Sequence, residues 1–247
     1  MRTLVLGIPL PHVTFDNYSF LSAPSLFDYA RVIVETSALS EAIEQVTTAG
    51  STEHRAYGGL TVVNGPAGPA AFSLAELLRL RRLEAERLLA RGGVIACFAY
   101  PDVSHEGIRE LPGWRRYDWL PGPDGFSYGE HLLAGYGKLG VELTDPEHAF
   151  VPYVQEFGVR LAFRAYLSEP EEVPPPHARV FARSPGGAAV GVEIEVGPGR
   201  VVLLPPIGSL DYSSDRAPLA AVLHQCLERM TAGGPDRQSH WLGKEAS

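Results

Sequence analysis

The stretch RTLVLGIPLPHVTFDNYSF, residues 2–20, decides the fold. Its apolar run 3–8 is too short for a helix and is bounded by glycine and proline, so it predicts a strand covered on both faces, as in parallel sheets. A polar cluster follows directly, in residues 12–19. Ligands usually bind at loops that leave the carboxyl ends of such strands. The stretch therefore predicts a buried first strand and one wall of a ligand site.

Two further apolar runs predict neighbours for this strand, ARVIVE at 30–35 and VIACFAY at 94–100. A helix is expected between them, from Ser73 as its N-cap to about Arg91, with leucines at helical spacing on its buried face. A helix, a glycine pair and a strand in succession are typical of α/β proteins. Residues 51–72, rich in glycine and proline, predict irregular structure with one short strand at 60–63.

The later part of the chain predicts three strands joined by tight turns, at 179–183, 188–196 and 200–204. A further strand is expected at 159–168, and a final helix, capped by Ser214 or Asp215, is expected to reach about residue 230. Residues 101–157 have few helix or strand signals and predict a long loop or lid. We expect one domain over 1–232 and a flexible tail over 233–247.

Composition limits the classes of function. A chain of 247 residues with 45% hydrophobic residues can bury one good core, and a net charge of −8 argues against nucleic acid as the partner. No apolar run reaches the length of a membrane span, and the amino-terminal segment is too short and proline-rich for a good signal peptide. Cys97 and Cys226 lie in apolar segments and are expected in the core, which fits a cytoplasmic location.

Motifs for cofactors are missing from the sequence. The histidines are scattered, without His-x-His, HExxH or CxxC spacing, so no metal is expected. The GxGxxG match GYGKLG at 135–140 does not follow a predicted strand, and no GxxxxGK[ST] loop is present, so no nucleotide cofactor is expected. Gly-x-Ser-x-Gly occurs once, as GFSYG at 125–129, but no strand is predicted before it, so it lacks the strand–turn–helix context of a typical serine hydrolase.

Polar residues after the predicted strands are the candidates for chemistry. Asp16, His105 and Asp118 are the candidate catalytic residues, because carboxylates and a nearby imidazole can carry out acid–base steps. The candidate ligand-binding residues are His12, Asn17, Asp102, Tyr117, Trp119, Asp211 and Tyr212. Each group also has an ordinary structural explanation: turns in the first two loops, aromatic anchors near residue 118, and helix capping near residue 211.

Three segments resemble a known family. Arg91-Gly92-Gly93 followed by VIACFAY, the segment VGVEIEVGPGRVVLLPP, and the helix after SLDYSSDRAP resemble the class I glutamine amidotransferase-like superfamily, in its trehalose-utilisation-type branch. The resemblance implies a flavodoxin-like three-layer sandwich, with a mainly parallel central sheet and a C-terminal antiparallel hairpin. The chain lacks the nucleophile elbow Gly-x-Cys-x-Gly and the downstream His-x-Glu, so amidotransferase chemistry is not carried over.

Two functions of different class remain open. The first is a non-catalytic or degenerate domain of this type that binds a small polar molecule or a partner protein. The second is an enzyme that acts on a sugar-like or other polar small molecule by acid–base catalysis. An exposed edge at the C-terminal hairpin would allow a homodimer.

Overall fold

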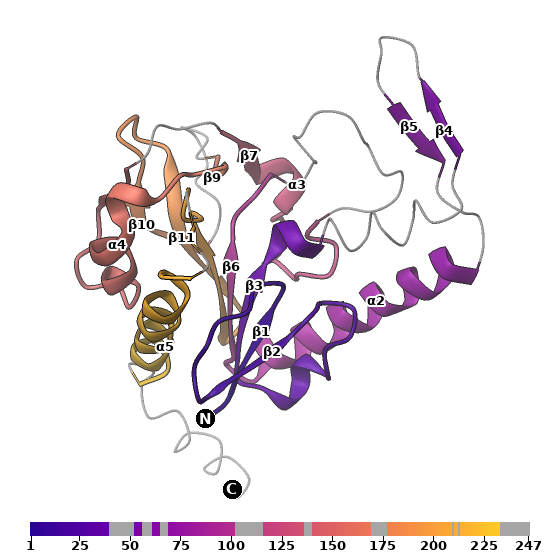
Figure 1. The fold of residues 1–247 in the computed structure, drawn as a ribbon, viewed down its shortest axis with the longest axis horizontal. Coiled ribbons are helices and arrows are strands. Elements are labelled where there is room, and N and C mark those ends of the chain that lie inside the picture. Colours follow the sequence, from indigo (N-terminus) through magenta and orange to yellow (C-terminus); the bar gives the residue numbers. More distant parts are fainter. Residues whose placement is uncertain are drawn as a thin grey trace, which may run out of the picture.

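The computed structural model describes residues 1–39, 52–55, 61–64, 69–101, 116–135, 140–168, 177–208, 210–211 and 213–232, and Figure 1 shows their arrangement. Its strands are β1 (Thr3–Leu6), β2 (Phe15–Tyr18), β3 (Arg31–Glu35), β4 (Thr52–Arg55), β5 (Thr61–Asn64), β6 (Val94–Phe98), β7 (Leu132–Ala134), β8 (Glu142–Leu143), β9 (Ala165–Leu167), β10 (Ala178–Arg183), β11 (Ala189–Val196) and β12 (Gly199–Leu204). Its helices are α2 (Pro69–Ala90), α3 (Tyr128–His131), α4 (Val151–Phe157) and α5 (Arg216–Ala232), with 3-10 turns η1 (Leu26–Asp28) and η2 (Gly158–Arg160).

One mixed sheet of ten strands organises the molecule, in the order β2-β1-β3-β6-β12-β11-β10-β8, with β9 and β7 added beside β11. The strands from β2 to β12 run parallel to their neighbours, and the strands beyond β12 pair antiparallel. The predicted α/β class and the antiparallel hairpin β11–β12 are therefore confirmed. Both strands of this hairpin have a further neighbour, because β12 also pairs with β6 and β11 also pairs with β10.

Two apolar cores lie on the two faces of the sheet. Side chains alternate between the faces of a strand, and β1 follows this rule: Leu4 and Leu6 join the cluster that contains Leu88 of α2. Val5 joins the opposite cluster, which contains Leu223 of α5. Figure 1 shows α2 on one side of the sheet and α4 with α5 on the other. Burial on both faces explains why β1, β3 and β6 read as continuous apolar runs.

The first loop contains a strand that the sequence did not predict. Residues Phe15–Tyr18 pair in parallel with β1, so that Asp16 lies opposite Leu4. Parallel neighbours usually need a crossover of a dozen or more residues, and this connection is shorter. The side chain of Asn17 holds it closed: its Oδ1 accepts from the Leu10 amide at 2.7 Å, and its Nδ2 donates to the Leu10 carbonyl at 3.0 Å.

Several other boundaries differ from expectation. Helix α2 begins at Pro69, before the predicted N-cap Ser73, because proline is well suited to a first helical position. The predicted long loop 101–157 contains α3, β7, β8 and α4 within its described part. Of the strand predicted at 159–168, only the part in β9 forms a strand. Within 51–72, β4 and β5 pair with each other as a separate hairpin. The predicted tail, 233–247, lies outside the described residues.

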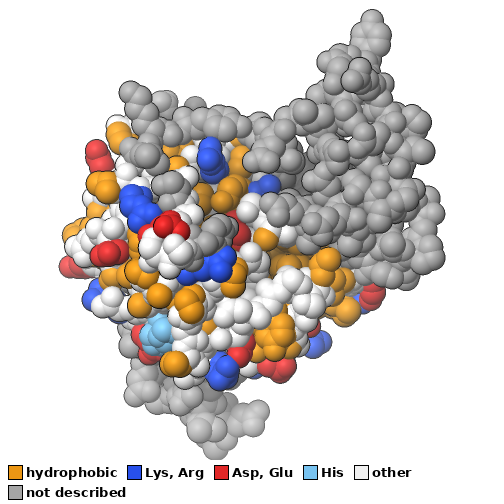
Figure 2. All heavy atoms as spheres, viewed as in Figure 1, with side chains coloured by type: hydrophobic (Ala, Val, Ile, Leu, Met, Phe, Trp, Pro, Cys, Tyr) orange, Lys and Arg blue, Asp and Glu red, His pale blue; other side chains and the backbone are white. Residues whose placement is uncertain are grey.

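The surface carries mixed charge. On the face seen in Figure 2, arginine and acidic side chains alternate with hydrophobic ones over the described part of the chain. None of the helices in the described ranges combines the length and the hydropathy that a membrane span requires.

Candidate functional site

The candidate site is a pocket where several parallel strands end. The chain leaves β1 toward β2 on one side, whereas it leaves β3 toward β6 on the other side. The gap between the carboxyl ends of β1 and β3 is therefore a topological switch point, where open α/β sheets usually bind ligands. A pocket of about 210 Å³ lies there, lined by Gly7, Ile8, Glu35, Ser37, Ala38, Phe98, Tyr100, Pro206, Ile207, Leu210 and Leu219.

Glu35, the last residue of β3, supplies the only charged side chain among the described residues of this lining. Its Oε1 accepts from the Ser37 hydroxyl at 2.8 Å and from the Ser37 amide at 3.2 Å. Burial raises the pKa of the Glu35 carboxyl, and the hydrogen bonds from Ser37 and the charge of Arg116 offset this only in part. A carboxylate that has lost much of its hydration can bind a donor from a ligand or take up a proton.

Tyr100 lies beside Glu35, just after the neighbouring strand β6. The hydroxyl of Tyr117 donates to the Tyr100 carbonyl at 2.7 Å and accepts from the Tyr100 amide at 3.1 Å, which fixes this turn. Burial and the charge of Glu35 raise the pKa of the Tyr100 phenol, so the group remains protonated at neutral pH. The Arg116 guanidinium lies 5.3 Å from the centre of the Tyr100 ring.

The backbone at the floor of the pocket requires glycine. Gly7 follows β1 with φ of +81°, and a Cβ at this position would lie 2.7 Å from the Cβ of Ala38. The hydroxyl of Thr36 donates to the Phe98 carbonyl at 2.7 Å and so ties the end of β3 to the end of β6. These contacts hold the strand ends around the pocket in fixed positions.

Asp16 and His12 lie away from this pocket. Asp16 forms an ion pair with Arg2, just before β1, and accepts from the Tyr29 hydroxyl at 3.2 Å. The His12 ring packs against the ring of His224 on α5 in a tilted arrangement, with the ring centres 4.3 Å apart. Both predicted residues therefore lie toward the amino ends of the strands, because the connection after β1 returns the chain to that end before β2 begins. Asn17 holds the β1–β2 connection, as described above.

The aromatic residues near 118 are anchors of the core. Trp119 is fully buried, and its indole nitrogen donates to the Arg116 carbonyl at 3.1 Å. Tyr117 is also buried and stacks on Tyr128, with the ring centres 5.1 Å apart. Asp118 is exposed and lines a second cavity, of about 170 Å³, beside Tyr117 and Tyr128. Trp119, a predicted ligand-binding residue, therefore does not form an open aromatic surface.

Asp211 shapes the turn before α5. Its carboxylate accepts from Ser213 and Ser214 at 2.7–2.9 Å, and these bonds lower the pKa of the Asp211 carboxyl. Asp215 accepts from the Asp211 amide at 2.8 Å and pairs with Arg160. Asp211 follows β12 at the carboxyl ends, whereas Asp16 bonds to groups at the amino ends, so the structure does not bring these two carboxylates together. The remaining candidates, Asp102, His105 and Tyr212, lie outside the described residues.

Both cysteines are buried and free. Cys97 lies in the middle of β6 with no exposed surface, and burial together with the charge of Glu35 raises the pKa of its thiol. A thiol in this state is a poor nucleophile. In the described part of the chain, no group of three or more His, Cys, Asp or Glu side chains is arranged to hold a metal ion.

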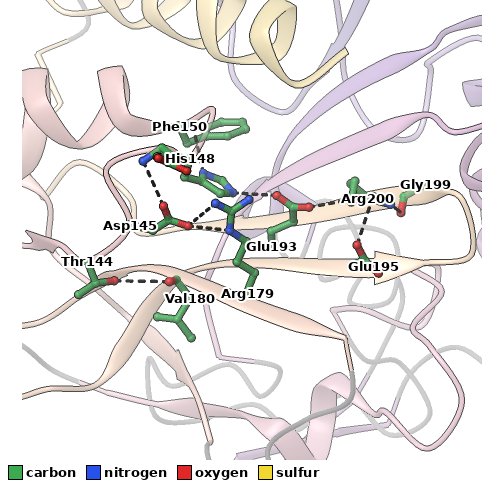
Figure 3. Close-up of polar contacts among 11 residues, drawn as sticks. Thr144, Asp145, His148, Phe150, Arg179, Val180, Glu193, Glu195, Gly199 and Arg200 are labelled. Atoms are coloured by element: carbon green, nitrogen blue, oxygen red, sulfur yellow. Dashed lines mark hydrogen bonds and ion pairs between the residues drawn. The ribbon is translucent and has the colours of Figure 1, made fainter. Parts of the chain in front are cut away.

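A buried histidine–glutamate pair lies elsewhere, under the antiparallel part of the sheet (Figure 3). The Nε2 atom of His148 lies 2.8 Å from Glu193, and its Nδ1 accepts from the Phe150 amide at 3.1 Å. The ring also stacks on Phe181 with the centres 4.0 Å apart. Because both ring nitrogens are occupied and the side chain is buried, we interpret this pair as a structural link between the loop before α4 and β11.

Sequence reasoning missed Glu35, Ser37 and Tyr100. A signal was present: each strand run, ARVIVE and VIACFAY, ends in or just before a polar side chain. The rule that ligands bind beyond strand ends directed attention to the following loops, whereas here the last strand residue itself lines the pocket.

Comparisons with known proteins give only distant likeness. No protein-family model matches the chain, and no curated protein matches it. The structure is similar to that of the cytoplasmic protein STM1381 from Salmonella typhimurium LT2, with a TM-score of 0.47 and 14% identity, over 93% of this chain and 99% of that chain. It is also similar to the cytoplasmic protein STM3548 from Salmonella typhimurium, with a TM-score of 0.47 and 11% identity, over 92% of this chain and 98% of that chain.

Proposed function

We propose that this chain binds a small polar molecule in the pocket at the carboxyl ends of β1, β3, β6 and β12. The observation that carries the proposal is the position of Glu35, a carboxylate at a topological switch point inside an otherwise apolar lining. Ser37 and Tyr100 add hydroxyl groups beside it. Such a pocket can orient a ligand through a few polar contacts while its apolar walls exclude water.

We propose further that the domain is a member of the glutamine amidotransferase-like superfamily with a flavodoxin-like three-layer layout and without the nucleophile. The parallel strands from β2 to β12 and the helices on both faces support that layout. The buried position of Cys97 supports a non-catalytic or degenerate member.

The alternative is an enzyme that acts on a sugar-like or other polar small molecule. One observation favours it: burial raises the pKa of Glu35, which brings this carboxyl closer to the pH at which a general base or acid works well. In this alternative Glu35, rather than Asp16, His105 or Asp118, exchanges the proton. Binding of a partner protein, a homodimer and a cytoplasmic location remain predictions from the sequence.

Thermal unfolding tests the proposal. We would measure the melting temperature with a panel of polyols, sugars, amines and carboxylates, because a specific ligand at 100 times its Kd stabilises a protein by about 2.7 kcal/mol. At least one compound should raise the melting temperature of the wild type and raise it less in Glu35→Gln. The matched control is Glu142→Gln, since Glu142 is exposed and lies in β8, away from the pocket. Equal shifts in all three proteins would place ligand binding elsewhere, and no shift with any compound would contradict the proposal.

A further inference from the structure

The charges around the pocket narrow the class of ligand. Glu35 has no ion-pair partner among the described residues, although ten ion pairs are found elsewhere in that part of the chain. Arg116 lowers the pKa of Glu35 through its charge, but its guanidinium lies by the ring of Tyr100 and is not part of the lining. Among the described residues of its lining, the pocket therefore presents one negative charge and no positive charge to a ligand.

Three side chains that carry oxygen atoms lie together in the pocket, those of Glu35, Ser37 and Tyr100. The hydroxyl of Ser37 lies 2.8 Å from Glu35 Oε1, and the Tyr100 hydroxyl is hydrogen-bonded within the same group. The rest of the wall is apolar, with Ile8, Phe98 and Leu210 among its residues. A protonated primary amine has three N–H donors, which match a carboxylate and two hydroxyl oxygens. Its hydrocarbon part would lie against the apolar wall.

We propose that this pocket takes a small organic cation, a primary amine whose ammonium group pairs with Glu35. This inference rests on the proposed function, because it assigns a ligand class to the same pocket. An ammonium group would replace the hydration that Glu35 loses by burial, whereas an uncharged alcohol would do so only in part and a carboxylate would be repelled. The aromatic rings of Phe98 and Tyr100 offer a further attraction to a cation.

Three compounds of equal length test this proposal at pH 7.5: n-butylamine, n-butanol and butyrate. Isothermal titration calorimetry on the full chain should show binding of n-butylamine, with n-butanol and butyrate weaker by about tenfold or more, the size of one charged hydrogen bond. Glu35→Gln should remove the preference for the amine by about the same factor. Glu142→Gln should keep it, which excludes a general attraction of amines to an acidic protein.

The possible failures can be distinguished. If n-butanol binds the wild type as tightly as n-butylamine, or if Glu142→Gln loses the preference as Glu35→Gln does, the amine proposal is wrong. A polyol or sugar that binds in a Glu35-dependent manner would then leave the proposed function standing. If Glu35→Gln does not fold, the affinities of the wild type for the three compounds still test the proposal. In addition, Ser37→Ala removes one of the three oxygens and should weaken the binding of n-butylamine more than the binding of n-butanol.

Discussion

At the scale of single residues, Glu35 combines two opposite effects. It gives the described part of the pocket lining its only charge, and it is destabilised by burial, as the raised pKa of its carboxyl shows. Side chains that bind a ligand often destabilise the free protein in this way, because the group that would stabilise their charge is absent until the ligand binds. The same position therefore connects ligand binding with the pH dependence of stability.

Glu35→Gln should change stability in a pH-dependent manner. A carboxyl whose pKa is raised in the folded state stabilises the fold while it is protonated, near and below the ordinary value of 4.5, and loses that contribution as the pH rises through its folded pKa. Glutamine resembles the protonated form, so the variant should melt at a higher temperature than the wild type at pH 8. The gain should shrink toward pH 4. Thermal scans at both pH values measure this, and an equal gain at both would show that the charge of Glu35 is not the cause.

Gly7→Ala should destabilise the fold by about 1–3 kcal/mol, because alanine at this φ is strained and its Cβ would clash with Ala38. Gly187→Ala is the matched control: Gly187 has φ of +86°, but a Cβ there would have nothing within 4 Å. Urea denaturation of both variants separates the clash from the backbone strain. Equal losses of unfolding free energy in the two variants would mean that the packing between the ends of β1 and β3 adjusts to the added methyl group.

At the scale of elements, the two halves of the sheet differ in how they are held. The parallel half rests on apolar contacts with α2 and α5, whereas the antiparallel half carries the buried pair of His148 and Glu193, to which the half-buried Arg200 is joined by an ion pair. Burial alone would raise the pKa of Glu193, but the hydrogen bond from His148 and the charges of Arg200 and Arg179 together lower it. This group joins the loop before α4 to strands β10–β12 (Figure 3).

Glu193 should therefore act on stability in the opposite sense to Glu35. A carboxyl with a lowered pKa contributes stability above its ordinary value of 4.5, and this contribution is lost as the pH falls through its folded pKa. Glu193→Gln should cost about 1–3 kcal/mol at pH 7, because it weakens bonds to a buried histidine. The difference from the wild type should narrow below pH 4, as urea denaturation at several pH values can measure. A constant difference across this range would contradict the role of the charge.

The sequence predicted the elements whose pattern is local. Strands β1, β3, β6, β11 and β12 follow from short apolar runs bounded by turn residues, and α5 follows from its cap and apolar stripe. Strand β2 could not be predicted, because its pairing depends on Asn17 closing a short connection. Trp119 appeared as a site residue because exposure cannot be read from residue type: the same aromatic group that suits a sugar also fills a core.

At the scale of the whole molecule, the topology places the pocket. The chain leaves β1 and β3 toward opposite sides of the sheet, which leaves a gap at their carboxyl ends. The segment after β12 and α5 supply the remaining wall through Pro206, Leu210 and Leu219. Most of these positions are apolar and serve the core as well. The ligand site is thus a property of the sheet order, which no single stretch of sequence contains.

Crystals soaked with a mixture of small amines, polyols and carboxylates test the central claim most directly, because electron density shows where a ligand binds. The account predicts an amine at the carboxyl ends of β1, β3 and β6, with its nitrogen within hydrogen-bond distance of Glu35. It also predicts that this density is lost in Glu35→Gln crystals and kept in Glu142→Gln crystals. Ligand density in the cavity beside Asp118, or at the amino ends beside Asp16, with the Glu35 pocket filled only by solvent, would contradict it.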